Sequence, residues 1–250
     1  MDLKEGIVSI TDHITEYSIE RAQLGKYLNP ILSESTQIIL VWHNKIDEDF
    51  LNQYKNIRAI FRYGVGFDNI DLEFCKKKNI LVCNNPDYGV DEVSDSAIAM
   101  ILNLTRGINE LQSFARANKN AWLGEEIPLK LYRLNNLKLG IIGLGRIGGA
   151  IARKFKVFSK NICFFDPYLS SGIEKTFDIE RADNLDDLLK EVDILSINTP
   201  LNHETKGLVN KNFISKMKKD SILINLSRGE IIENTEYIKN ALISGKLKGY

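Results

Sequence analysis

Three glycines at a fixed spacing form the pattern in this sequence that points most directly to a chemistry. Gly143, Gly145 and Gly148 form G-x-G-x-x-G between an apolar run and a helical pattern. The first glycine permits a tight turn, the second lets the backbone approach a diphosphate, and the third allows close helix–strand packing. Arg146 and Ile147 lie at the start of that helix, whose N–H groups and positive dipole end would face the phosphates. The pattern predicts a dinucleotide site, with an ordinary glycine-rich turn as the alternative.

One acidic residue fits the same interpretation. Asp166 follows the next apolar run, at the offset of about 20 residues where a carboxylate holds the adenosine ribose hydroxyls. A carboxylate there would repel a 2′-phosphate, and Pro167 and Tyr168 follow it rather than an arginine. The residues therefore favour NAD over NADP as the cofactor. The alternative is that Asp166 and Pro167 only begin a turn.

Strands and helices that alternate along the chain must position these residues. Short apolar runs of this kind are typical of strands buried on both faces of a sheet. The runs are residues 6–10, 37–42, 57–62 and 80–84, and then residues 139–142, 161–165, 193–198 and 221–225. Residues 93–118 and 146–158 fit helices. The alternation predicts an α/β fold with two doubly wound parallel sheets and right-handed crossovers.

The two series of strands predict two domains, at residues 1–105 and 106–250. The boundary is expected between about Thr105 and Asn136, crossed by a long helix that starts near Asp91.

Composition limits the partners. Lys plus Arg equals Asp plus Glu, 33 against 33, so charge gives no reason to expect nucleic acid or an anionic membrane. No apolar run approaches the roughly 18 residues of a membrane span, and the N-terminus does not resemble a signal peptide. The scattered three cysteines and three histidines predict no metal site and fit a reducing cytoplasm.

Four spaced motifs, taken together, resemble the D-isomer-specific 2-hydroxyacid dehydrogenase family. They are residues 62–71, 141–147, 198–205 and 225–229, in the family's order. The resemblance covers essentially the whole chain and implies a flavodoxin-like substrate domain, an NAD-binding Rossmann domain and a homodimer. Within the family, the chain is most similar to the phosphoglycerate dehydrogenase and C-terminal-binding protein branches, and the latter includes transcriptional corepressors.

The resemblance implies a catalytic role for Arg228. A guanidinium is a planar fork of donors, suited to a substrate carboxylate and its neighbouring carbonyl oxygen. Arg228 follows a predicted strand, and Asn225 and Gly229 frame it as in the family. A surface arginine in a loop salt bridge is the alternative. The other cofactor-binding residues implied by the resemblance are Thr199, Pro200, Thr205, Leu226 and Ser227.

The substrate is expected to contact the loop after a strand in the first domain. The loop Gly64, Val65 and Gly66 would offer backbone N–H groups to the substrate carboxylate, unless it is a simple turn. Arg62 could supply a second cation or a structural ion pair. His43 follows another strand end and could line the cleft, although a lone histidine is often structural.

The resemblance also implies a histidine general acid and base, made more basic by a glutamate. In the family both follow the segment that resembles residues 245–249, and this sequence ends at Tyr250. We therefore expect the last Rossmann strands to be missing and the chain to be a fragment. We also expect it not to turn over 2-oxo acids at a family-like rate.

Three functions are compatible with these residues. The first is NAD-dependent hydride transfer on a small D-2-hydroxy acid, acting on its CH–OH group. The second is a noncatalytic, NAD-responsive scaffold or corepressor. The third, a different NAD enzyme on a similar fold, is disfavoured by the motifs at residues 64–71 and 225–229.

Overall fold

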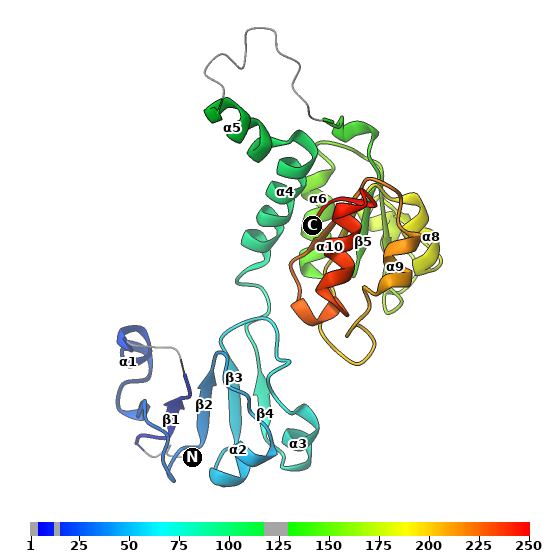
Figure 1. Cartoon of the computed structure of the whole chain (residues 1–250). Helices are drawn as coiled ribbons and strands as arrows, with labels where there is room; N and C mark the ends of the chain where they lie inside the picture. The colour runs from blue at the N-terminus through cyan, green and yellow to red at the C-terminus, as the bar shows by residue number, and fades with distance from the viewer. Residues whose placement is uncertain (1–4, 13–15, 118–129) are drawn as a thin grey trace. The chain divides into compact units, whose positions relative to one another are not determined.

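Branched apolar runs form two parallel β-sheets in the computed structural model, which describes residues 5–12, 16–117 and 130–250 (Figure 1). The chain divides between Gly89 and Val90 into two units, and each unit holds one sheet. All eight strands that the sequence predicted are present, each within one or two residues of the predicted ends. The predicted α/β fold with two parallel sheets is confirmed.

The first unit has a four-stranded sheet in the order β1-β2-β3-β4. Val8 in β1 also forms a parallel bridge to Leu28, on the edge that faces away from β2. If the segment at Leu28 is counted as a strand and all strands are numbered by their position in the chain, the order in the sheet is 2-1-3-4-5, as in flavodoxin-like sheets. The elements are β1 (Val8–Ile10), α1 (Ser18–Leu24), η1 (Gly25–Tyr27), β2 (Ile38–Val41), α2 (Glu48–Gln53), β3 (Ala59–Arg62), α3 (Leu72–Lys77) and β4 (Leu81–Cys83).

Aspartates start the two helices that cover the core of this sheet. The side chains of Asp47 and Asp71 accept hydrogen bonds from the N–H groups of Phe50 and Phe74, at 3.0 and 2.9 Å, at the first turns of α2 and α3. Such N-caps satisfy N–H groups that have no partner inside the helix. Leu51 and Phe74 then pack into the cluster of buried side chains beneath β2 and β3.

The second unit has a six-stranded sheet in the order β10-β9-β8-β5-β6-β7, with every pair parallel. By chain position this is 6-5-4-1-2-3, the Rossmann order. The elements are α4 (Val90–Arg106), α5 (Ile108–Ala117), η2 (Leu134–Asn136), β5 (Leu139–Ile142), α6 (Arg146–Phe155), β6 (Ile162–Phe165), α7 (Ile173–Phe177), β7 (Glu180–Arg181), α8 (Leu185–Glu191), β8 (Ile194–Ile197), α9 (Lys211–Lys216), β9 (Ser221–Asn225), η3 (Gly229–Ile231), α10 (Thr235–Ile243) and β10 (Leu247–Gly249).

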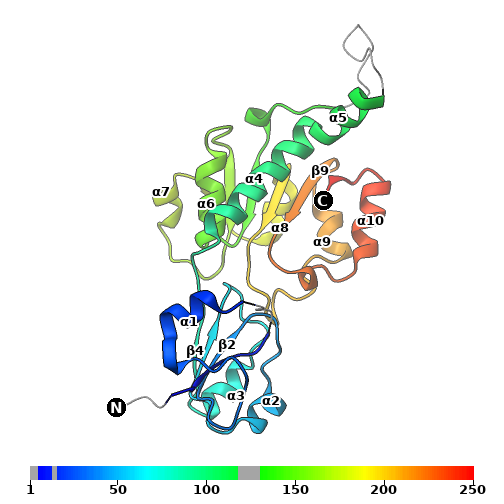
Figure 2. The same ribbon diagram turned by 90° about the vertical axis from the view of Figure 1, so that its left-hand side faces the viewer.

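Helices cover both faces of this sheet, because side chains along a strand point to alternate faces. Leu139 and Ile141 in β5 join a core with α4 and α6, which includes Ile101 and Phe155. Ile142 joins the core on the other face, with α8, α9 and α10. Figure 2 shows α4 beside α6, and α9 beside α10. The sheet is thus buried on both faces, and β5 lies at its centre between β8 and β6.

The predicted long helix at residues 93–118 is wrong as a single element. It is two helices, α4 and α5, separated by Gly107 with a φ of 59°. A residue in this left-handed conformation ends the hydrogen-bond ladder of a helix, and glycine adopts it without strain. Residue 118 lies outside the described residues.

The limits of the second unit also differ from the expected ones. The unit begins at Val90 rather than at residue 106, because α4 packs against α6 and β9. Part of the predicted boundary region, residues 118–129, lies outside the described residues. We expected the last strands of this sheet to be missing. The structure forms β10 parallel to β9, through Leu247 and Gly249, so all six positions of the Rossmann order are occupied.

Candidate functional site

The glycine turn joins the central strand β5 to α6, and two of its glycines are required by the fold. A Cβ atom added at Gly148 would lie 2.1 Å from the carbonyl oxygen of Gly143. Gly143 itself has a φ of 83°, and its added Cβ would lie 2.9 Å from the carbonyl oxygen of Asn198. By contrast, nothing lies within 4 Å of a Cβ added at Gly145. The space beside Gly145, next to the first turn of α6, is therefore open to a ligand.

Asp166 is tied to this turn. Its Oδ2 accepts a hydrogen bond from the N–H of Leu144 at 3.0 Å, and its Oδ1 accepts one from the N–H of Tyr168 at 3.0 Å. Asp166 is half-buried at the end of β6, the neighbour of β5 in the sheet. Because a carboxylate offers about four acceptor positions, these two bonds leave capacity for ribose hydroxyl groups.

The loop after β8 lies on the other side of β5. The N–H of Asn198 donates to the carbonyl oxygen of Ile142 at 2.8 Å, which holds the loop against the end of β5. The Oγ1 atom of Thr199 is buried without a hydrogen-bond partner among the described residues. A buried hydroxyl of this kind is costly unless something bonds to it. Thr205 braces the loop by donating to the carbonyl oxygen of Pro200 at 2.6 Å.

Two exposed side chains link the loops that follow β6 and β8. The hydroxyl of Tyr168 donates to the carboxylate of Glu204. This hydrogen bond raises the pKa of Tyr168, with burial as a smaller cause. Since β6 and β8 flank β5 in the sheet, this hydrogen bond joins loops that follow the two neighbours of β5.

Arg228 lies in the loop that follows β9. The Nδ2 of Asn225 donates to the carbonyl oxygen of Arg228 at 2.9 Å, and the N–H of Ser227 donates back to Asn225 Oδ1 at 3.1 Å. Ser227 Oγ bonds to the carbonyl oxygen of Ile197, which ties this loop to β8. Leu226 packs on the core beneath α4 and α6. The N-x-x-R-G pattern thus folds on itself and holds the half-buried Arg228 at the carboxyl end of the sheet.

The predicted cofactor residues of the second unit therefore gather at one edge of its sheet. The strand order reverses between β5 and β8, and the loops after β5, β6, β8 and β9 all leave from the carboxyl ends of their strands. This is the place where open α/β sheets bind ligands. Arg146 is exposed at the first position of α6, and Ile147 packs on the core.

The predicted substrate residues of the first unit also follow strand ends. The guanidinium of Arg62 lies across Gly64, since a Cβ added at Gly64 would lie 1.7 Å from Arg62 Nη1. The same guanidinium lies over the Trp42 ring, 5.5 Å from its centroid. Asn84 Nδ2 donates to the carbonyl oxygen of Val65 at 2.7 Å. The Nε of Arg62 is buried without a hydrogen-bond partner among the described residues.

Asp12, which was not among the residues predicted from the sequence, organises the loop after β2. Its carboxylate accepts hydrogen bonds from the N–H groups of Trp42, His43 and Asn44 at 3.0, 2.6 and 3.0 Å. Burial alone would raise the pKa of Asp12, but a hydrogen bond from Thr11 and these three N–H groups together lower it. Asp12 comes shortly after β1, and its position after a strand end was the only available clue. The ring of His43 is exposed and lies edge-on to Trp42.

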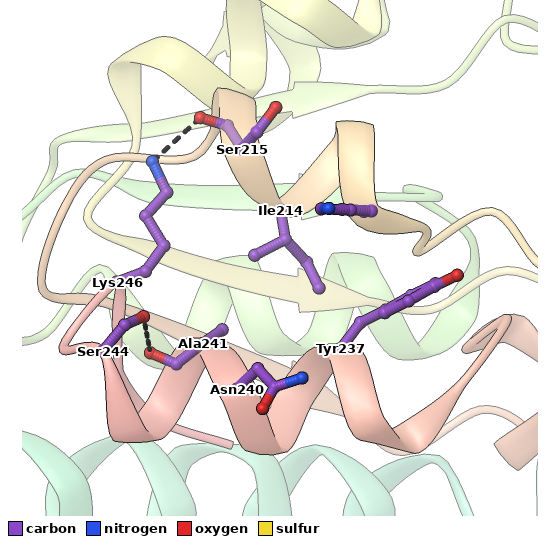
Figure 3. A pocket seen from close by; sticks show the side chains of 8 residues that line it. Ile214, Ser215, Tyr237, Asn240, Ala241, Ser244 and Lys246 are labelled. Carbon is purple, nitrogen blue, oxygen red and sulfur yellow. Dashed lines mark hydrogen bonds between the residues drawn. The ribbon is translucent and has the colours of Figure 1, made fainter.

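A groove in the second unit involves none of the predicted residues. It has a volume of about 540 Å³ between α9 and α10. Figure 3 shows its lining residues, with Lys246 bonded to the carbonyl oxygen of Ser215 at one end and Tyr237 at the other. Within the described ranges no group of His, Cys, Asp and Glu side chains could hold a metal ion, and no helix could cross a membrane.

The sheet order and the glycine turn define the second unit as a Rossmann-type dinucleotide-binding domain. Residues 98–250 match the family model described as D-isomer specific 2-hydroxyacid dehydrogenase, NAD binding domain. This match covers more than half of the chain, which therefore belongs to the D-isomer specific 2-hydroxyacid dehydrogenase family. The cofactor of this domain is accordingly NAD, as the residues at the turn predicted.

Known relatives agree with this assignment. The chain is 28% identical over 246 residues to the D-3-phosphoglycerate dehydrogenase of Methanocaldococcus jannaschii, covering 98% of this chain and 46% of the relative. It is 35% identical over 208 residues to the Bacillus subtilis enzyme of the same name, covering 82% and 38%. The chain thus spans less than half the length of these curated relatives. The D-lactate dehydrogenase of Aquifex aeolicus, solved with NAD and lactic acid, superposes with a TM-score of 0.85 at 30% identity, covering 97% of this chain and 75% of that one.

Two glycine substitutions in the turn should differ in their effect on the free energy of unfolding. We expect Gly148→Ala to lower the free energy of unfolding by about 2–3 kcal/mol, because its methyl group would overlap the Gly143 carbonyl. Gly145→Ala should change it by less than about 1 kcal/mol, because its methyl group meets open space. Urea denaturation of both variants measures the difference. Equal losses, or a larger loss for Gly145→Ala, would contradict the described turn.

Asp12→Asn should destabilise the first unit in a pH-dependent way. The folded-state pKa of Asp12 is lowered, so its contribution is present above the unfolded pKa and is lost as the pH falls below about 3.8. We expect a loss of about 1–2 kcal/mol at pH 7, because the amide cannot accept all three N–H bonds. In urea denaturation, the difference in unfolding free energy between Asp12→Asn and the parent protein should become smaller below pH 4. The exposed Asp87→Asn serves as the control, and a gap independent of pH would refute the assignment.

Proposed function

We propose that this chain supplies NAD-binding and substrate-binding parts of an oxidoreductase that transfers a hydride between nicotinamide and a small D-2-hydroxy acid or 2-oxo acid. The observation that carries the proposal is the open space beside Gly145, next to Asp166 and the buried Thr199 hydroxyl. A diphosphate beside Gly145 would meet the first-turn N–H groups of α6, and Thr199 would gain a partner. Family membership supports the same activity.

The cofactor residues follow from this placement. N–H groups between Gly143 and Gly148 hold the diphosphate, with Arg146 as a nearby cation. The carboxylate of Asp166 accepts hydrogen bonds from the adenosine ribose and repels a 2′-phosphate. Thr199 and Pro200, with Thr205 as their brace, form the loop toward the nicotinamide half of the cofactor. When bound, NAD supplies the hydride acceptor or donor.

The substrate residues must hold a carboxylate and polarise a carbonyl. Arg228 donates to the carbonyl oxygen and draws electron density away from the carbon that exchanges the hydride. Asn225 holds the backbone of Arg228, and Arg228 Nη1 donates to the carbonyl oxygen of Ser227 at 2.9 Å. In the first unit, backbone N–H groups of Gly64, Val65 and Gly66 bind the substrate carboxylate, with Arg62 as a second cation. His43 lines the same strand ends.

Phosphoglycerate and lactate are the substrates in the names of the relatives, and small 2-oxo acids of this class are the substrates we propose for the whole protein. A homodimer is part of the proposal. The noncatalytic scaffold becomes the better interpretation if the whole protein binds NADH and reduces none of these acids.

Loss of NADH absorbance with a panel of 2-oxo acids, measured on the whole protein, tests the activity. Arg228→Lys keeps the charge and removes the fork, and we expect about a 100-fold fall in kcat/KM with little change in NADH affinity. Arg116→Lys, at an exposed position of α5, is the matched control and should behave as the parent protein. Equal turnover by Arg228→Lys and the parent would rule out the role of Arg228.

A further inference from the structure

One arginine that no motif includes organises the loop after Asp166. Arg181 lies in β7, opposite Phe164 of β6 in the sheet register. Its guanidinium lies over the Phe164 ring, 4.9 Å from the centroid. Its side chain is 25% exposed, so it is largely held against the protein. Stacking and register together fix where its donors point.

These donors bond to the backbone that continues from Asp166. Nη1 donates to the carbonyl oxygens of Asp166 and Leu169 at 3.4 and 3.2 Å, and Nη2 donates to that of Ser170 at 2.8 Å. The loop at residues 166–170 has no regular secondary structure to satisfy these carbonyl groups. One side chain therefore supplies the hydrogen bonds that hold the loop in shape.

The Nε donor of Arg181 bonds to a side chain instead of to the loop. Its Nε bonds to Glu174 Oε2 at 3.2 Å, and Glu174 Oε1 accepts a hydrogen bond from the N–H of Gly172 at 2.9 Å. The backbone N–H groups of Glu174 and Gly172 lower the pKa of Glu174, and the hydrogen bond from Arg181 lowers it further. The carboxylate thus orients Arg181 and joins the end of the loop to the start of α7.

Arg181 holds the loop without forming an ion pair with the carboxylate of Asp166. It bonds to the carbonyl oxygen of Asp166, while the Asp166 carboxylate accepts from the N–H groups of Leu144 and Tyr168. An ion pair between the two side chains would compete with ribose hydroxyls for the same oxygens. The observed bonds leave the negative charge facing the glycine turn.

We propose that Arg181 is a positioning residue that holds Asp166 toward the adenosine ribose, and so sets the preference for NAD over NADP. The inference rests on the proposed function, because it needs the dinucleotide beside Gly145. The hydrogen bonds of Arg181 go to the loop and to Glu174. Its effect must therefore pass through Asp166.

A double-mutant cycle tests that dependence. NADH and NADPH affinities are measured by fluorescence titration for the parent, Arg181→Met, Asp166→Asn and the double variant. We expect Arg181→Met to weaken NADH binding about tenfold in the parent and less than about twofold in the Asp166→Asn background. The ratio of NADH to NADPH affinity should also narrow. Lys175→Met removes a nearby exposed charge on α7 and should leave both affinities unchanged.

Each outcome decides one point. A parent protein that binds no NADH overturns the proposed function itself. If the parent binds NADH, an unchanged affinity in Arg181→Met overturns the inference. The same loss in both backgrounds also overturns it, because a purely structural role would weaken binding equally. If Arg181→Met does not fold, Arg181→Lys replaces it in the cycle, since lysine keeps the charge but cannot bond to three carbonyl groups.

Discussion

The close approach of Gly148 to the carbonyl of Gly143 is the constraint on which the second unit depends. No other residue leaves room for that carbonyl, so α6 can start directly above the end of β5 only with glycine at this position. The same approach turns the first N–H groups of α6 toward the carboxyl edge of the sheet. Asp166 and Asn198 then bond to the backbone around the turn from β6 and β8. The open space beside Gly145 thus results from how closely α6 approaches the end of β5.

In the first unit, side chains rather than a helix start hold the loops that follow the strands. Asp12 gathers three N–H groups of the loop after β2, and Arg62 lies flat across Gly64 in the loop after β3. Both loops leave the carboxyl ends of parallel strands. The backbone of these loops is therefore held by one half-buried acid, Asp12, and one stacked cation, Arg62. The backbone N–H groups of Gly64, Val65 and Gly66 are the groups proposed to contact a ligand.

Local patterns were enough to predict the strands and the glycine turn, because burial on both faces gives an unmistakable apolar run. The break at Gly107 could not be separated from a glycine tolerated inside a helix, since only its φ of 59° distinguishes the two. β7, with two residues, was too short to give any pattern.

The residues that support the site were harder to find than the residues in its motifs. Asp12 and Arg181 act on loops far from them in the sequence or across a turn, and their types are common on any surface. Their roles come from register and packing, which no spacing rule encodes. Motif positions such as Gly145 were predictable because their chemistry is local to the turn.

Hydrogen exchange of backbone amides, with and without NADH, tests the central claim most directly. The account predicts that saturating NADH slows exchange at residues 143–149 and 166–170, and leaves the groove segments at residues 211–216 and 237–246 unchanged. Saturable NADH binding that protects the groove between α9 and α10, with no change at residues 143–149, would contradict it.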